Sequence, residues 1–152
     1  MAYTEIKERN RKRYYYRVSS VRRGAKINKK RIYLGVNLKN DELKQKEEKT
    51  DKELLREKIN KSIKKIKFKI KKVLNKYNIK KAGVFGSYVR GQQNKNSDID
   101  IIVEPPKGIG FGFVRIAYDL EKALNKKVDL LTYKGINPRL KKYILEEEIR
   151  II

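Results

Sequence analysis

Hydrophobic and polar positions alternate in the first part of the chain. Between residues 14 and 19, Tyr, Tyr and Val are interleaved with Tyr, Arg and Ser, and residues 31–34 form a second short run that ends at Gly35. Alternation with a period of two predicts β-strands, because successive side chains of a strand point to opposite faces. The polar stretch that starts at Gly24 and reaches Lys30 is typical of a turn. Residues 13–35 are therefore predicted to form a β-hairpin.

The pattern changes to helical spacing after Asn40, which is a suitable N-cap residue. Residues 41–77 contain neither Pro nor Gly and are rich in Lys, Glu and Leu, so we expect a long helix, continuous or broken near Thr50. Its second half carries an apolar stripe with spacings of four and three, formed by Ile59, Ile63, Ile66, Ile70, Val73 and Tyr77. The stripe predicts a face that packs on the following domain, and a short coiled-coil seam is the alternative.

The last part of the chain alternates short apolar runs with helical periodicity. The apolar run that ends with Val84 and Phe85 and the runs at 97–103 and 127–132 predict strands, and the helical spacing predicts helices over 113–124 and 138–148. Asn137 followed by Pro138 is a typical helix start. Residues 149–152 suit either a last short strand or a frayed tail.

These elements predict an α/β (α+β) fold with a small mixed sheet flanked by helices, preceded by a basic β-hairpin and a long helix. We expect three segments: a basic β-rich module in 1–38, a helical linker in 39–59 and a catalytic domain in 60–152.

Candidate chemistry is concentrated around the first two strands of that domain. Gly86 and Ser87 follow an apolar run, so the chain is expected to turn tightly there, with Ser87 capping a short helix whose N–H groups face a phosphate. Asp98 and Asp100 are two residues apart, which places both carboxylates on one face of a strand. Two adjacent carboxylates repel each other unless a cation lies between them, and Mg²⁺ prefers such oxygen ligands.

Composition restricts the chemistry further. The chain of 152 residues contains no Cys and no His, which excludes disulfides, thiol nucleophiles, imidazole bases and the usual zinc sites. No apolar run is long enough for a membrane helix and the N-terminus lacks the apolar core of a signal peptide, so a cytoplasmic protein without a membrane partner is expected.

The net charge of +23 is distributed unevenly. Residues 1–80 contain 28 basic and 9 acidic side chains, whereas residues 81–152 contain 13 and 9. Tyrosines interleaved with cations in residues 1–38 favour nucleic-acid binding through stacking and phosphate contacts. A solvated hairpin packed on the following helix is the equally weighted alternative.

The motif Gly86-Ser-x-x-Arg90-Gly, followed by Ser97-Asp-x-Asp100, resembles the nucleotidyltransferase superfamily of DNA polymerase β type. Its form is most similar to the minimal nucleotidyltransferase (MNT) branch, and the order of elements matches that branch over roughly residues 60–152. The resemblance implies a third carboxylate on the strand after the second helix of that fold, a place that Asp129 occupies.

The resemblance also implies roles for the site residues. Asp98, Asp100 and Asp129 would be the catalytic carboxylates and would hold one or two Mg²⁺ ions, with Asp129 on the side of the attacking hydroxyl. Nucleotide phosphates would be bound by Gly86, Ser87 and Arg90.

Small proteins of the MNT branch are typically antitoxins whose partner is a HEPN-type toxin. The resemblance implies that this chain transfers AMP from ATP to a tyrosine hydroxyl of such a toxin. The basic front half departs from the family pattern. The alternative is a protein without catalysis that binds nucleic acid or occludes a toxin and keeps the nucleotidyltransferase fold as a scaffold.

Overall fold

The computed structural model describes residues 2–23 and 26–152. Contacts divide the chain into two compact units, Met1–Arg56 and Glu57–Ile152. One long helix, α1 (Asn40–Lys76), contributes its first part to the former unit and its second part to the latter.

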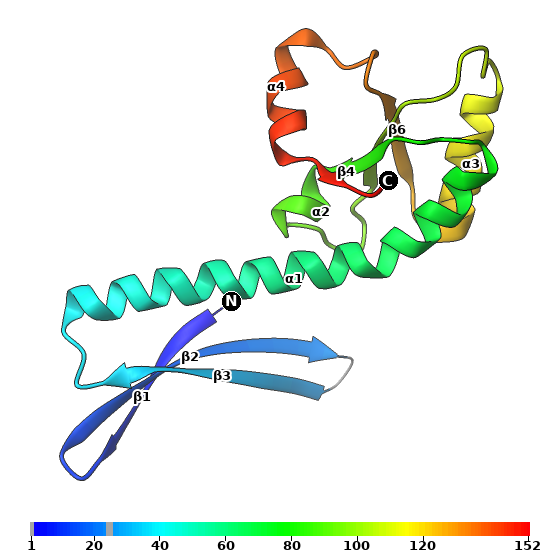
Figure 1. Ribbon diagram of the computed structural model, residues 1–152. Helices are drawn as coiled ribbons and strands as arrows, with labels where there is room; N and C mark the ends of the chain where they lie inside the picture. The colour runs from blue at the N-terminus through cyan, green and yellow to red at the C-terminus, as the bar shows by residue number, and fades with distance from the viewer. Residues whose placement is uncertain (1, 24–25) are drawn as a thin grey trace. The chain divides into compact units, whose positions relative to one another are not determined.

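The first unit contains an antiparallel sheet of strands β1 (Ala2–Arg9), β2 (Lys12–Arg23) and β3 (Lys26–Val36), with β2 in the centre (Figure 1). The predicted hairpin corresponds to β2 and β3. The predicted turn is too long, because residues 26–30 belong to β3; the rest of that turn, residues 24–25, lies outside the described residues. Strand β1 was not predicted from the sequence.

The turn between β1 and β2 explains how the additional strand forms. Asn10 and Arg11 both have positive φ angles, 49° and 57°. Two consecutive residues with positive φ match the right-handed twist of a hairpin, and Asn is favoured there even when Gly is absent. Residues 2–23 are thereby folded into a tight β-hairpin.

The first part of α1 packs on one face of this sheet through an ion cluster. Arg17 donates to both Asp51 carboxylate oxygens at 2.8 and 2.5 Å and to the Thr4 hydroxyl at 3.0 Å. The Thr4 hydroxyl in turn donates to Glu47, which also pairs with Arg17 at 3.4 Å. The Arg17 side chain is only 15% exposed, so this cluster fixes the helix on the face of the sheet that contains Thr4 and Arg17.

Helix α1 is continuous through Thr50, and its apolar stripe faces the core of the second unit. Ile63, Ile70 and Val73 are buried, and the other members of the stripe pack against them, which confirms the core-facing interpretation.

The N-cap of α1 was predicted at Asn40, and this prediction is wrong by one residue. The carbonyl of Lys39 accepts the first helical hydrogen bond, and the Glu42 side chain accepts from the Lys39 N–H at 3.2 Å.

The second unit contains a mixed sheet with the order β6-β5-β4-β7. Its strands are β4 (Ala82–Phe85), β5 (Ile99–Val103), β6 (Val128–Thr132) and β7 (Ile149–Arg150), and its helices besides α1 are α2 (Ser87–Arg90), α3 (Gly112–Leu124) and α4 (Pro138–Glu147) (Figure 1). Strands β5 and β6 are parallel, whereas β4 is antiparallel to both of its neighbours. The predicted α/β (α+β) class with a small mixed sheet is confirmed. Of the two alternatives for residues 149–152, the short strand is confirmed for Ile149 and Arg150, which form β7.

The two faces of this sheet are covered unequally. One face carries the main core, in which Ile99, Ile101 and Val103 of β5 pack with α1 and α3. The other face carries a smaller cluster of Phe85, Ile102 and Ile136, with Ile144 of α4 against it. Asp100 alternates with Ile99 and Ile101 and therefore lies on the less covered face.

Among the helices of the described residues, none is long and apolar enough to cross a bilayer.

Candidate active site

The turn after β4 brings the backbone into contact with β5. Gly86 has φ +70°, a conformation that favours glycine, and a Cβ at this position would collide with the Asp100 carboxylate. Helix α2 begins at Ser87, with Gly86 as its N-cap and without a hydrogen bond from a capping side chain. The expectation that Ser87 caps the helix is therefore wrong. The tight turn and the close approach of the backbone at Gly86 are confirmed.

Two of the predicted carboxylates lie side by side on neighbouring strands. Asp100 of β5 is directly in register with Asp129 of β6 in the parallel pair. Residues opposite each other in a sheet project to the same face, so the two side chains leave the sheet on one side. Asp98 precedes β5 by a single residue and is partly exposed. The strand order, rather than proximity in the sequence, thus brings Asp129 to the other two carboxylates.

The electrostatic environment of Asp100 shows that these groups interact. Burial raises its pKa most, and the charge of Asp129 and, more weakly, that of Asp98 raise it further. A hydrogen bond from the backbone N–H of Ser87 and the charge of Arg90 lower the same pKa. The net effect is a raised pKa of Asp100, so the positive charge near Asp100 does not compensate for its burial and for the neighbouring carboxylates.

A carboxylate that the sequence analysis missed also lies at this site. Glu147, the last residue of α4, accepts from the backbone N–H of Gly86 at 2.8 Å. Its two oxygens also accept from Nη1 of Arg90 at 3.0 and 2.8 Å. Glu147 thus occupies the two groups, Gly86 and Arg90, that were predicted to bind phosphate. No signal in the sequence distinguishes it, because the run Glu146-Glu147-Glu148 is typical of a solvated helix end.

The donor set suits a divalent cation held by oxygen. No group of three or more acidic side chains among the described residues is arranged as a ready-made metal site. Asp100 and Asp129 nevertheless share a face, and their mutual repulsion raises the pKa of Asp100. A hard cation between them would relieve that repulsion and would leave coordination positions for phosphate oxygens. The residues therefore fit Mg²⁺, and the metal and nucleotide roles of the six site residues stay predictions.

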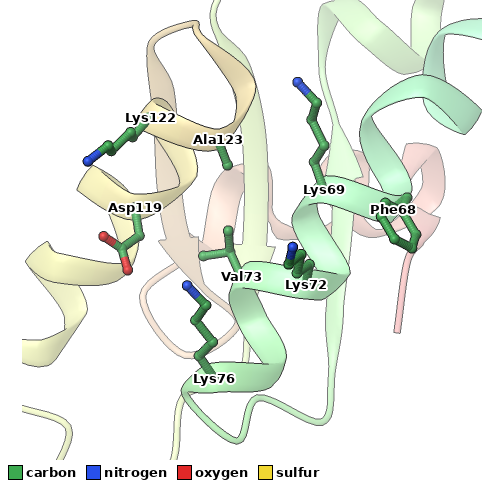
Figure 2. A pocket seen from close by; sticks show the side chains of 8 residues that line it. All are labelled: Phe68, Lys69, Lys72, Val73, Lys76, Asp119, Lys122 and Ala123. Carbon is green, nitrogen blue, oxygen red and sulfur yellow. The ribbon is translucent and has the colours of Figure 1, made fainter.

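The groove between α1 and α3 does not coincide with this site. A groove of about 490 Å³ lies between α1 and α3, where Figure 2 shows Val73 and Ala123 at its base and the side chains of Lys69, Lys76 and Lys122 around it. It contains none of the predicted site residues. At the predicted active site Arg90 and Asp129 are exposed and Asp100 is partly exposed, so these side chains are open to solvent.

Fold and site together define a nucleotidyl-transfer domain: a small mixed sheet that places a Gly-Ser turn beside carboxylates on two adjacent strands. The family described as Polymerase beta, Nucleotidyltransferase matches residues 68–152, the part of the chain that contains all of these elements. The chain belongs to this family and is an enzyme of the nucleotidyltransferase class.

Two relatives illustrate the similarity in sequence. MJ0435 of Methanocaldococcus jannaschii, named as a candidate protein adenylyltransferase, is 46% identical over 92 residues, which cover 60% of this chain and 99% of the relative. The protein adenylyltransferase MntA of Thermococcus cleftensis is 32% identical over 84 residues, covering 53% of this chain and 83% of the relative.

Two solved structures share the fold. One is described as a toxin-antitoxin with AMP-PNP and has a TM-score of 0.51 and 28% identity, covering 57% of this chain and 72% of the matched chain. The other is described as a candidate minimal nucleotidyltransferase and also has a TM-score of 0.51 and 28% identity, covering 57% of this chain and 93% of the other. The expected resemblance to the MNT branch is confirmed by these matches.

Proposed function

We propose that this protein is an antitoxin that transfers AMP from ATP to a tyrosine hydroxyl of a HEPN-type toxin, with Mg²⁺ bound at Asp98, Asp100 and Asp129. The observation that carries the proposal is the register of Asp100 opposite Asp129, next to the Gly86-Ser87 turn. Two relatives named as protein adenylyltransferases and a toxin-antitoxin crystal structure with AMP-PNP support the choice of reaction and partner.

Each site residue has a defined task in the transfer. The Gly86 N–H, the Ser87 hydroxyl and Arg90 bind the β and γ phosphates, which orients the α-phosphate toward the carboxylates. Mg²⁺ held by Asp98, Asp100 and Asp129 would supply charge neutralisation for the triphosphate and for the attacking and leaving oxygens. Asp129 accepts the proton of the tyrosine hydroxyl while the tyrosine oxygen forms a bond to the α-phosphorus. The bond from that phosphorus to the α,β-bridging oxygen breaks, and pyrophosphate leaves.

The openness of the site explains why the acceptor belongs to another protein. Asp129 is exposed on β6, and the groups around it come from strand ends and one turn. A site of this shape does not surround a small acceptor by itself. A hydroxyl on a folded partner can instead be positioned by the surface of that partner.

The test incubates the full chain and the product of the adjacent reading frame with ATP labelled at either the α or the γ phosphate. The α label is expected on the partner and the γ label is not, because pyrophosphate carries the γ phosphate away. Asp129→Asn is expected to abolish labelling, whereas Glu104→Gln, an exposed carboxylate at the end of β5, is the matched control and keeps it.

Two results would contradict the proposal. Labelling that persists in Asp129→Asn would show that Asp129 is not the proton acceptor. A partner that is never labelled, yet loses its toxicity on binding this chain, would show inhibition by occlusion instead of catalysis.

A further inference from the structure

The first unit has a sheet face that the first part of α1 does not cover. Thr4 and Arg17, which contact α1, lie opposite each other in the β1–β2 register and mark the helix side. Strand side chains alternate between faces, so the residues next to Thr4 and Arg17 along the strands project to the other side. We refer to that side as the open face. Among the described side chains it consists of Tyr3, Glu5, Lys7, Arg9, Lys12, Tyr14, Tyr16, Val18, Ser20, Ile27, Lys29, Arg31, Tyr33 and Val36. Val18, on the central strand, is fully buried, whereas Ile27 is exposed.

Contacts across the strands confirm that these side chains share one surface. The Tyr16 and Tyr33 rings are 5.5 Å apart at a tilt of 53°, and Lys7 lies over the Tyr16 ring at 5.7 Å. Glu5 pairs with Arg31 at 2.8 Å and with Lys7 at 4.0 Å. The open face therefore combines aromatic rings with cations in direct contact with one another.

The open face is rich in tyrosines and cations and poor in carboxylates. Its described side chains include four tyrosines and five cations against a single carboxylate, Glu5. Tyr3 and Tyr33 are 44% and 54% exposed, so both rings are accessible to a ligand. Exposed rings interleaved with cations match a ligand that presents flat aromatic surfaces and regularly spaced negative charges.

We propose that the open face binds single-stranded nucleic acid, with bases stacked on the tyrosines and phosphates paired with the surrounding lysines and arginines. The proposal is independent of the transfer reaction in the second unit. A duplex fits less well, because its bases are already stacked on one another and offer no free ring faces to Tyr33. An acidic protein would satisfy the cations but would leave the exposed rings without partners.

Glu5 allows a test in which a substitution is expected to increase the affinity for nucleic acid. Glu5 pairs with Arg31 and Lys7, and the hydrogen bond from Arg31, together with the charges of Arg31, Lys7 and Lys29, lowers the pKa of Glu5. It therefore competes with phosphate for those cations. Its removal frees them, so Glu5→Gln is expected to tighten nucleic-acid binding, and an increase in affinity cannot come from unfolding.

The experiment measures fluorescence anisotropy of the full chain with labelled 20-nucleotide single-stranded RNA, single-stranded DNA and a DNA duplex over a range of salt concentrations. Single strands are expected to bind more tightly than the duplex and to dissociate as salt is raised. The RNA and DNA arms show whether the 2′-hydroxyl contributes. Tyr33→Ala is expected to weaken binding about 5- to 150-fold, the range for losing one stacked base. Tyr33→Phe keeps the ring and is expected to retain affinity, which separates stacking from the fold of the sheet.

Glu8→Gln is the matched control for Glu5→Gln. It changes the net charge by the same amount on the same strand, but the Glu8 side chain lies on the other face and forms an exposed ion pair with Arg13. We expect a several-fold gain for Glu5→Gln and less than a twofold change for Glu8→Gln.

The proposal is overturned if the two Gln variants bind equally, since bulk charge would then explain the affinity. It is overturned as well if Tyr33→Ala binds like the unaltered chain, if the duplex binds as tightly as the single strands, or if poly-glutamate competes as effectively as unlabelled oligonucleotide. Absence of any salt-sensitive binding would favour a solvated sheet.

Discussion

The hydrogen bonds of Glu147 predict that this residue limits nucleotide affinity. Its carboxylate accepts one bond from the Gly86 N–H and two from Arg90, and these are the groups assigned to the phosphates. A triphosphate can reach them only after the carboxylate has left. Glu147→Gln keeps the shape of the side chain and removes its charge, so we expect this variant to bind ATP more tightly.

The size of the gain follows from the bonds that must be exchanged. Hydrogen bonds to charged groups contribute about 1.5–3 kcal/mol, against about 1 kcal/mol for neutral ones. Replacing the carboxylate therefore lowers the free energy needed to break these hydrogen bonds in favour of phosphate by about 1 kcal/mol per fully buried bond. Arg90 is 49% exposed, so solvent screens its two bonds strongly. We expect a total of about 1 kcal/mol, which corresponds to roughly fivefold tighter binding.

Isothermal titration calorimetry of ATP, with Mg²⁺ present, measures this change directly. Glu146→Gln is the matched control, because it removes the same charge from the exposed neighbouring residue of α4. The control is expected to bind ATP within twofold of the unaltered chain. Unchanged or weaker binding in Glu147→Gln would refute the competition and would indicate that Glu147 holds Arg90 in place for the phosphates.

Two further predictions concern stability. The raised pKa of Asp100 means that the folded protein binds a proton at pH values where the unfolded chain has lost it, so stability falls as the pH rises through that range. In EDTA at pH 7, Asp100→Asn is expected to raise Tm by about 2–4 °C, the shift for ~1 kcal/mol after solvent screening; the gain should shrink toward the ordinary carboxyl pKa of 3.8, and a loss of Tm would contradict the argument. Arg17→Ala removes a largely buried partner of two carboxylates and is expected to destabilise the first unit by about 1–3 kcal/mol, seen as faster hydrogen exchange of β2 amides. Arg13→Ala, which loses an exposed ion pair with Glu8, is the control and is expected to change stability by less than about 0.5 kcal/mol.

Local patterns were sufficient to predict the second unit. The apolar runs before Gly86 and around Asp100 became β4 and β5, and the stripe from Ile59 to Tyr77 became the buried face of α1. These elements bury apolar residues with a clear period, so tertiary packing and local preference agree. The approach of Asp129 to Asp100 depends on the β5–β6 register, and only the family resemblance indicated it in advance.

The unpredicted parts depend on contacts between distant residues. Strand β1 has a weak alternation, and it is stabilised by pairing with β2 and by the Thr4 contacts to Arg17 and Glu47. Glu147 is 61 residues away from Gly86 in the chain, and its role follows from the position at which α4 ends. Neither feature leaves a pattern that local sequence reasoning can detect.

The central claim is that the carboxylates around the Gly86-Ser87 turn bind a metal–nucleotide complex. Titration calorimetry of the full chain with ATP tests it most directly, with and without Mg²⁺, in Asp98→Asn, Asp100→Asn and the control Glu104→Gln. We predict that ATP binding requires Mg²⁺, collapses in both Asp variants and persists in Glu104→Gln. Binding that is unchanged in Asp98→Asn and Asp100→Asn, or that does not depend on Mg²⁺, would contradict the account.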